Sequence, residues 1–131
     1  KLKGINIPSS KSAYLIDEYP ILSIAASQAI GMTAMKGLNE LRHKESDRIK
    51  SISNNFKKLE IKFHLKNDDL FIFGKKLKIK NEVLIKTYND HRIAMAFSIL
   101  NILCGKKLKI DNKKCISISY PDFEKHLKHL M

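Results

Sequence analysis

Two short segments bring acids and arginines together in a chain whose positive charge otherwise comes from lysine. Leu41 to Ile49 reads LRHKESDRI, and Thr87 to Ala94 reads TYNDHRIA. Of the 25 basic residues only three are arginine, Arg42, Arg48 and Arg92, and the last two lie beside acids in these segments. A planar guanidinium holds a carboxylate or phosphate through two parallel hydrogen bonds, which a lysine ammonium cannot do. The pattern therefore predicts a site for a small anionic molecule.

The acids in these segments are open to two interpretations. Glu45 lies between Lys44 and Arg48, and a carboxyl group beside two cations can donate or accept a proton once bound substrate alters the local charge. A surface glutamate in the first turn of a helix, with no catalytic role, would occupy the same position in the sequence. Asp17 and Asp90 precede predicted helices, where capping alone accounts for an aspartate. From the residues alone, the catalytic and the structural interpretations both stay open.

Two predicted helices position the charged segments. Apolar residues at positions 49, 52, 56 and 59 have the spacing of an amphipathic helix, which predicts a helix over 45–59 with Asp47 in its first turn. A second helix is predicted over 90–103, and apolar residues on nearly every side indicate that it is buried. Free N–H groups and the helix dipole favour anions at helix N-termini. We therefore expect the two helix ends to converge on one doubly anionic molecule.

The rest of the chain alternates between strand and helix patterns. Strands are predicted over 2–7, 33–38, 61–65, 70–73, 76–80, 83–88 and 107–110, and helices over 17–30 and 121–130. Residues 67–69 make the turn of a hairpin. The order predicts an α/β (α+β) chain of two similar units, residues 1–74 and 75–131, the second lacking the hairpin. Because two such units leave many strand edges open, we expect further parts of a parent protein to complete the sheets.

Composition narrows the class of protein. With 131 residues, 44% of them hydrophobic, the chain is long enough for one modest domain with a core. It begins with Lys1, so we interpret it as a piece of a longer protein, and its longest apolar run, 94–104, is too short to span a membrane. Cys104 and Cys115 fit no disulfide framework and no metal-ligand spacing, which favours reduced thiols in a cytoplasmic protein.

The net charge of +12 makes a basic nucleic-acid-binding module an alternative interpretation. However, the 22 lysines are spread over predicted strand edges and turns, as on a solvated surface, and they do not alternate with aromatic residues as in RNA-binding modules. His43, His64, His126 and His129 lie in no metal-ligand pattern, so a structural use is sufficient for them. No metal site is predicted.

Four motifs, in order, resemble the 5-enolpyruvylshikimate-3-phosphate synthase family. They are IDEYPILSIAA, GLNELRHKESDRI, YNDHRIAMAF and SISYPDFEKHL, and the resemblance covers essentially the whole chain. It implies the inverse-barrel fold of the enolpyruvyl transferases, built from repeated βαβαββ units, with about two units present here and the last completed by the polypeptide's own N-terminus. It also implies transfer of the enolpyruvyl group from phosphoenolpyruvate to the 5-hydroxyl of shikimate 3-phosphate, with release of phosphate, in chorismate and aromatic amino acid biosynthesis.

The resemblance implies a role for each site residue. Asp17 would hold the 5-hydroxyl and accept its proton, and Glu45 would protonate the methylene carbon of phosphoenolpyruvate. Arg48 and Arg92 would bind phosphoenolpyruvate by its carboxylate and phosphate. The further substrate-binding residues would be Lys44, Asp90 and His91. No metal or organic cofactor is implied. The implied partners are the two substrates and the N-terminal part of the parent chain, with neither nucleic acid nor a membrane.

One departure and two alternatives accompany the resemblance. Some family members carry a phosphate-binding lysine where this chain has Ile118 in SISYP, so that role is not assigned. A sister transferase acting on a nucleotide sugar shares the fold but fits KESDR and NDHRIAM less well. An inactive relic or split-gene fragment would keep the same motifs. We expect the isolated chain to be inactive, because it carries one wall of a two-walled site.

Overall fold

A computed structural model describes residues 1–131 as two successive groups of elements. The first contains β1 (Asn6–Ile7), α1 (Ser12–Leu15), α2 (Tyr19–Gln28), β2 (Gly31–Met35), α3 (Arg48–Lys58), β3 (Phe63–Lys66) and β4 (Asp69–Gly74). The second contains β5 (Val83–Ile85), α4 (His91–Leu103), β6 (Leu108–Ile110) and α5 (Phe123–His129). Apart from the single turn of α1, the order is βαβαββ followed by βαβα, which is the predicted order without the strand expected over 76–80.

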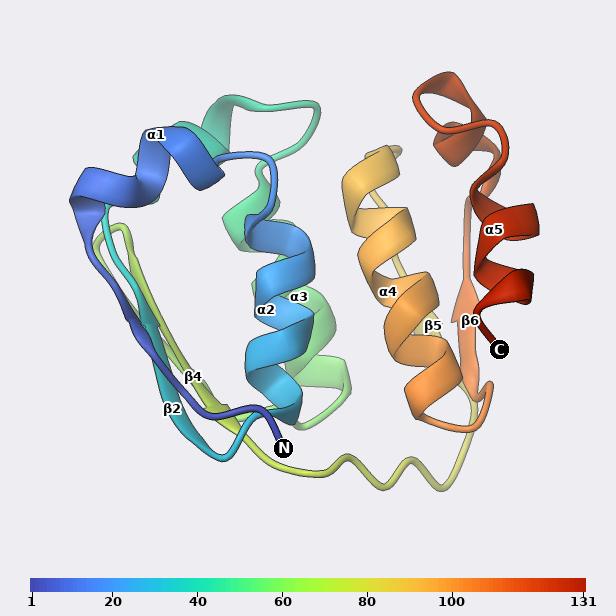
Figure 1. Cartoon of the computed structure of the whole chain (residues 1–131), viewed down its shortest axis with the longest axis horizontal. Helices are drawn as coiled ribbons and strands as arrows, with labels where there is room; N and C mark the ends of the chain where they lie inside the picture. Colours follow the sequence, from blue (N-terminus) through green and yellow to red (C-terminus); the bar gives the residue numbers. More distant parts are fainter.

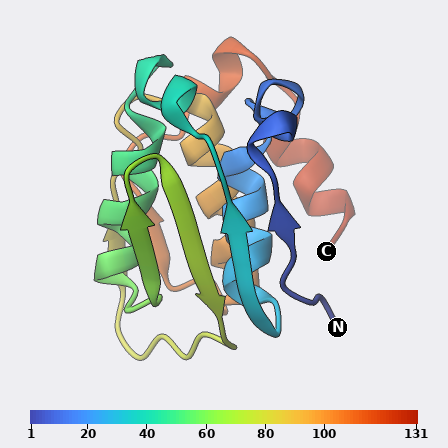
Figure 2. The ribbon, with the colours of Figure 1, turned by 90° about the vertical axis from the view of Figure 1, so that its left-hand side faces the viewer.

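A four-stranded sheet in the order β1-β2-β4-β3 forms one outer layer of the molecule (Figure 2). β1 pairs with β2 in parallel, whereas β4 is antiparallel to both β2 and β3. The β3–β4 hairpin turns at Asn67, whose φ of 54° is a left-handed conformation that asparagine tolerates well. At the end of β4, Gly74 lies so close to the carbonyl oxygen of Ala29 that a Cβ there would overlap it. The predicted hairpin is confirmed. Asn67 suits its turn, and Gly74 suits the close backbone contact at the end of β4.

The second sheet is a parallel pair, β5 and β6, joined by a crossover through α4. Figure 1 shows α2, α3 and α4 lying between this pair and the four-stranded sheet. α5 packs against α4, where Phe123 meets Ala94 in a small separate cluster. Helices α2, α3 and α4 therefore occupy the centre of the molecule, and the sheets lie on either side of them (Figure 1).

One core of 20 buried hydrophobic residues connects both sheets through the helices. Ile49, Ile52 and Phe56 of α3 are buried in it, as their helical spacing predicts. The rings of Phe56 and Phe97 meet edge to face, with centroids 6.2 Å apart and planes at 74°. This contact joins α3 to α4 and so joins the two groups of elements. None of the helices combines the length and apolar character needed to cross a membrane.

Some predicted boundaries are wrong. Residues 76–80 form no strand, although lysines alternate there with Leu77 and Ile79. These two side chains pack against the core, but β5 pairs only with β6 and no other strand lies beside the segment. The helix predicted from Glu45 begins at Arg48, because Asp47 is its N-cap and accepts a hydrogen bond from Lys50 N at 3.0 Å.

Other elements are shorter than predicted. The first strand contains only Asn6–Ile7, and Lys3 forms an isolated bridge with Ile30. α2 begins at Tyr19, so Asp17 lies in the turn before the helix rather than at its first residue. α5 begins at Phe123, two residues after Pro121. In each case the pattern identified the element, and the hydrogen bonds at its ends set its length.

Candidate active site

The two charged segments meet where α2, α3 and α4 begin, at the upper edge of Figure 1. Arg48 is the first residue of α3 and Arg92 the second residue of α4. Asp17 precedes α2, Glu45 lies in the loop before α3, and Asp90 is the N-cap of α4. Ion pairs link all five side chains, which we call the carboxylate–arginine cluster. The predicted helix ends thus meet, and the anionic molecule on which they would converge stays a prediction.

Arg48 is the centre of the cluster, and its side chain is only 1% exposed. Its Nε donates to Asp90 Oδ2 at 2.9 Å, and its Nη1 donates to Asp17 Oδ1 at 2.9 Å. Its Nη2 donates to Glu45 Oε2 at 2.6 Å. A buried guanidinium requires such partners, because an unpaired buried charge is strongly unfavourable. Three carboxylates from three different loops therefore compensate one arginine.

Asp90 is fully buried, and its carboxylate is saturated with donors. Oδ2 accepts from Arg48 Nε and from Ser46 Oγ, each at 2.9 Å. Oδ1 accepts from Arg92 N at 3.0 Å and, at 3.4 Å, from Arg48 Nη2. A carboxylate offers about four lone-pair positions, so none is left for a further donor. Asp90 is at once a helix cap, as predicted, and the buried counter-ion of Arg48.

Arg92 lies at the exposed side of the cluster, with its side chain 33% exposed. Its Nη1 donates to the backbone oxygen of Asp17 at 3.1 Å and to Glu18 Oε1 at 3.4 Å, and its Nη2 lies 3.9 Å from Asp17 Oδ2. These contacts are longer than the three short bonds of Arg48 to Asp90, Asp17 and Glu45, and they are more open to water. Arg92 is thus the more available of the two arginines for a bound anion.

The cluster shifts the pKa of two of its members. Burial tends to raise the pKa of Asp17, but the hydrogen bond from Arg48 and the charges of Arg92, Arg48 and Lys44 lower it below its usual 3.8 overall. For Arg48, burial tends to lower the pKa, and the hydrogen bonds and charges of Asp90, Asp17 and Glu45 raise it above its usual value overall. Both groups are therefore ionised at neutral pH, and Asp17 is a weak base while the arginines remain beside it.

The lowered pKa of Asp17 predicts acid-sensitive stability. A carboxyl group with a lower pKa in the folded state stabilises the fold above its unfolded pKa, and this contribution is lost as the pH falls through its folded pKa. The Asp17 side chain is 45% exposed, so solvent screening limits the effect to less than about 1 kcal/mol. Urea unfolding of the wild type and of Asp17→Asn should show a gap in stability at neutral pH that narrows at acid pH. A gap that is independent of pH would contradict this prediction.

Lys44 and His91 take more peripheral places. Lys44 is exposed in the loop before α3 and influences Asp17 only through its charge. His91 is the first residue of α4, is partly buried and makes no side-chain hydrogen bond. Both residues border the carboxylate–arginine cluster and belong to none of its ion pairs.

Sequence reasoning missed two residues that contact the cluster. Ser46 donates to Asp90, and Glu18 accepts from Arg92. Ser46 lies inside KESDR, but nothing in the spacing distinguishes it from the other serines of the chain. Glu18 follows Asp17 directly and carries the same charge, so the sequence alone could not show that both acids contact Arg92.

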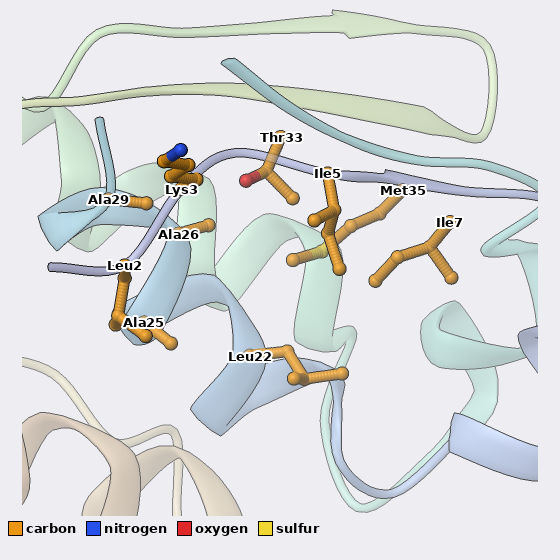
Figure 3. Close-up of a pocket in the computed structure, with 10 residues that line it drawn as sticks. All are labelled: Leu2, Lys3, Ile5, Ile7, Leu22, Ala25, Ala26, Ala29, Thr33 and Met35. Atoms are coloured by element: carbon orange, nitrogen blue, oxygen red, sulfur yellow. The ribbon is translucent and has the colours of Figure 1, made fainter. Parts of the chain in front are cut away.

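Two cavities differ in their relation to the cluster. One of about 160 Å³ opens beside Asp17 and Arg92, and its apolar lining is formed by Pro20, Ile21, Met95, Ala96, Ile99, Tyr120 and Phe123. Another of about 170 Å³ lies between α2 and the edge of the four-stranded sheet and is lined mainly by aliphatic side chains such as Leu2, Ile5 and Leu22 (Figure 3). Lys3 is the only ionisable residue that lines this second cavity, so it lacks the groups for proton transfer. No three His, Cys, Asp or Glu side chains are grouped to hold a metal ion.

A family model described as EPSP synthase (3-phosphoshikimate 1-carboxyvinyltransferase) matches residues 2–127. The 3-phosphoshikimate 1-carboxyvinyltransferase of Clostridium tetani is 44% identical over 127 residues, and that of Persephonella marina is 45% identical over 130 residues. These alignments cover 97% and 99% of this chain but only 29% and 30% of the relatives. The chain therefore spans less than a third of their length.

A solved structure agrees with the sequence comparisons. The EPSP synthase of Acinetobacter baumannii matches with a TM-score of 0.84 at 34% identity. The match covers 98% of this chain and 30% of that protein. The similarity thus extends through both sheets and the helix ends that carry the carboxylate–arginine cluster.

Proposed function

This chain belongs to the EPSP synthase family, and from that premise we propose that it forms part of a 3-phosphoshikimate 1-carboxyvinyltransferase. The proposed reaction transfers the enolpyruvyl group of phosphoenolpyruvate to the 5-hydroxyl of shikimate 3-phosphate and releases phosphate. The observation that supports it is the pair of half-exposed carboxylates, Asp17 and Glu45, held on one buried guanidinium. This arrangement offers two proton-transfer groups beside an anion-binding arginine.

The proposed chemistry needs one group to accept a proton and another to donate one. The 5-hydroxyl oxygen bonds to the central carbon of phosphoenolpyruvate while Asp17 takes the hydroxyl proton. Glu45, which must first take a proton from solvent, passes that proton to the methylene carbon. The tetrahedral intermediate then loses phosphate as its C–O bond breaks, and a methyl proton returns to a base to restore the double bond. Asp17 and Glu45 bond to neighbouring nitrogens of the Arg48 guanidinium, so they are close enough to serve one substrate pair.

The anionic group of the substrate would displace the Asp17 and Glu45 carboxylates from the N–H donors of the arginines. The Nη atoms of Arg48 bond to Asp17 and Glu45, whose side chains are 45% and 50% exposed. A carboxylate or phosphate that binds Arg48 and Arg92 would take over donors now used by Asp17. Because those donors lower the pKa of Asp17, their loss would raise it and make Asp17 a stronger base. Binding of phosphoenolpyruvate would thus activate the proton acceptor.

The remaining roles follow from position. Lys44 is exposed beside Asp17 and Glu45, where its ammonium would attract both anionic substrates. His91 would border the bound phosphoenolpyruvate from the start of α4. Asp90 has no free acceptor position, so its part would be to hold Arg48 rather than to touch substrate. We expect neither a metal nor an organic cofactor.

The same proposal concerns the parent protein. Residues 1–74 and 75–131 would be two repeated units of one domain, and the preceding part of the parent chain would supply the other wall of the site. In the carboxylate–arginine cluster the three acids, Asp17, Glu45 and Asp90, outnumber the two arginines, so both arginines are already paired within this chain. Further cations for two phosphorylated substrates would therefore come from the other wall.

Phosphate release from phosphoenolpyruvate and shikimate 3-phosphate tests the proposed function. We expect no turnover by the 131-residue chain alone and turnover when it is mixed with the preceding part of its parent protein, because the isolated chain carries one wall of the site. Each part tested alone is the control. Turnover by this chain alone would contradict the two-walled site. No turnover by a folded and associated mixture would favour a relic or a different substrate.

A further inference from the structure

The Arg48 guanidinium has two edges that are held in different ways. Its Nε edge faces Asp90, whose side chain is fully buried. The shortest bonds of its Nη atoms go to Asp17 and Glu45, whose side chains are about half exposed, and Nη2 lies in addition 3.4 Å from Asp90 Oδ1. A ligand arriving from solvent can replace the exposed carboxylates but has no access to the buried one. The orientation of the Arg48 Nη groups, which a ligand could bind, therefore depends on how firmly Asp90 is held.

Asp90 is held through each of its oxygens by a group outside Arg48. The backbone N–H of Arg92 fixes Oδ1 at 3.0 Å, as part of the cap of α4. Ser46 Oγ fixes Oδ2 at 2.9 Å, and Oδ2 is the oxygen that accepts from Arg48 Nε. Ser46 is therefore the side chain, besides Arg48, that donates to Asp90 Oδ2, the oxygen that accepts from Arg48 Nε.

The hydroxyl of Ser46 is itself positioned by α3. Ser51 is buried in the first turns of that helix, and its Oγ lies 3.1 Å from Ser46 Oγ and 2.8 Å from the carbonyl oxygen of Asp47. The Ser51 proton is shared between these two acceptors, and the Ser46 proton is directed to Asp90. The Ser46–Asp90 bond spans 44 residues and connects the loop that carries Glu45 to the cap of α4. It thus fixes two parts of the cluster relative to each other.

We propose that Ser46 is a positioning residue, which acts through Asp90 Oδ2 to keep the Nη edge of Arg48 turned toward the anionic group of a substrate. This inference deepens the proposed function and rests on it for its kinetic consequence. Ser46 does not touch the substrate, and it contributes to binding only by limiting the orientations of Arg48. Removing the Ser46 hydroxyl leaves the backbone N–H of Arg92 as the only donor outside Arg48 that holds the carboxylate. The carboxylate and the guanidinium then have more freedom to turn together.

The kinetic test uses the assembled enzyme with three variants of α3 and its preceding loop. Ser46→Ala should raise the KM for phosphoenolpyruvate about tenfold while kcat changes less than about threefold, as expected for loss of one hydrogen bond to a charged group that affects binding alone. Ser46→Thr keeps the hydroxyl and should restore the KM. Ser53→Ala is the matched control, because Ser53 Oγ is buried in α3 without a hydrogen-bond partner. It should leave both constants unchanged.

A second readout does not depend on turnover. In the 131-residue chain, the Nε–H of Arg48 is buried and donates to Asp90, so its ¹⁵N NMR signal should exchange slowly with water. Exchange should be faster in Ser46→Ala and slow again in Ser46→Thr. An equal exchange rate in wild type and Ser46→Ala would overturn the inference. An unchanged KM in Ser46→Ala would also overturn it. A fall in kcat together with a lower unfolding midpoint would overturn it as well, because these two changes together indicate a general structural role. If the wild-type assembly does not turn over, the proposed function fails, and the exchange rates still decide the role of Ser46.

Discussion

Glu45→Gln should lower the kcat of the assembled enzyme by about 10³-fold, within the range that general acid catalysis contributes. Glutamine has nearly the shape of glutamate, and its amide oxygen can still accept the hydrogen bond that Arg48 Nη2 now donates to Glu45. Glutamine cannot make the proton transfer to the methylene carbon of phosphoenolpyruvate that the proposed function assigns to Glu45. The loss should therefore be in kcat, with little change in the KM for either substrate. Initial rates of phosphate release provide the measurement.

The matched control for this variant is Glu82→Gln. Glu82 is an exposed glutamate in the segment between β4 and β5, outside the carboxylate–arginine cluster. The same change of charge at this position should leave kcat unaffected. If Glu45→Gln retained activity within about tenfold of wild type, proton transfer by Glu45 would be refuted, and the residue would be left with a role in holding Arg48.

Asp90→Ala should lower the free energy of unfolding by about 3 kcal/mol, because it leaves a buried arginine without its buried counter-ion. Arg48 would keep only its two half-exposed partners, Asp17 and Glu45. The variant also removes the N-cap of α4, which accepts from Arg92 N. Urea unfolding of the 131-residue chain at neutral pH measures the loss.

Two further variants test the reason for that loss. Glu18→Ala removes an acid that pairs with Arg92 but is 55% exposed, and it should cost less than about 1 kcal/mol. Asp90→Ala combined with Arg48→Met should be less destabilising than Asp90→Ala alone, because no unpaired charge is then buried. If the double variant were the less stable of the two, the compensation of Arg48 by Asp90 would not explain the loss.

The sequence predicted the elements of this fold better than their ends. Helical spacing in α3 identified its buried face, and the apolar residues of α4 identified a helix that is central to the core. The false strand at 76–80 shows why alternation is insufficient, since Leu77 and Ile79 are packed against the core without a neighbouring strand. A strand exists only when a partner is present, and the residues of the strand itself do not reveal the partner.

The sequence singled out the five residues of the carboxylate–arginine cluster, but not their hydrogen bonds to one another or the contacts of Ser46 and Glu18. The scarcity of arginine singled out Arg48 and Arg92, and their position at helix N-termini predicted that they converge. The expected anion clamp, however, has Asp17, Glu45 and Asp90 bonded to Arg48. Whether an acid beside an arginine is its partner or a neighbour depends on rotamers and on burial. Rotamers and burial are properties of the folded chain, and the spacing of residues along the sequence does not reveal them.

The Arg48–Asp90 pair joins residues 42 positions apart, one from each group of elements. Before the two groups dock, Arg48 has no buried counter-ion and is open to water. Its burial therefore requires both groups of elements to be in place, so the ion pair forms only in the docked chain. A ligand that needs the docked form of Arg48 selects such chains from the ensemble and stabilises them by mass action. Any ligand of this kind would therefore lower the population of partly unfolded chains.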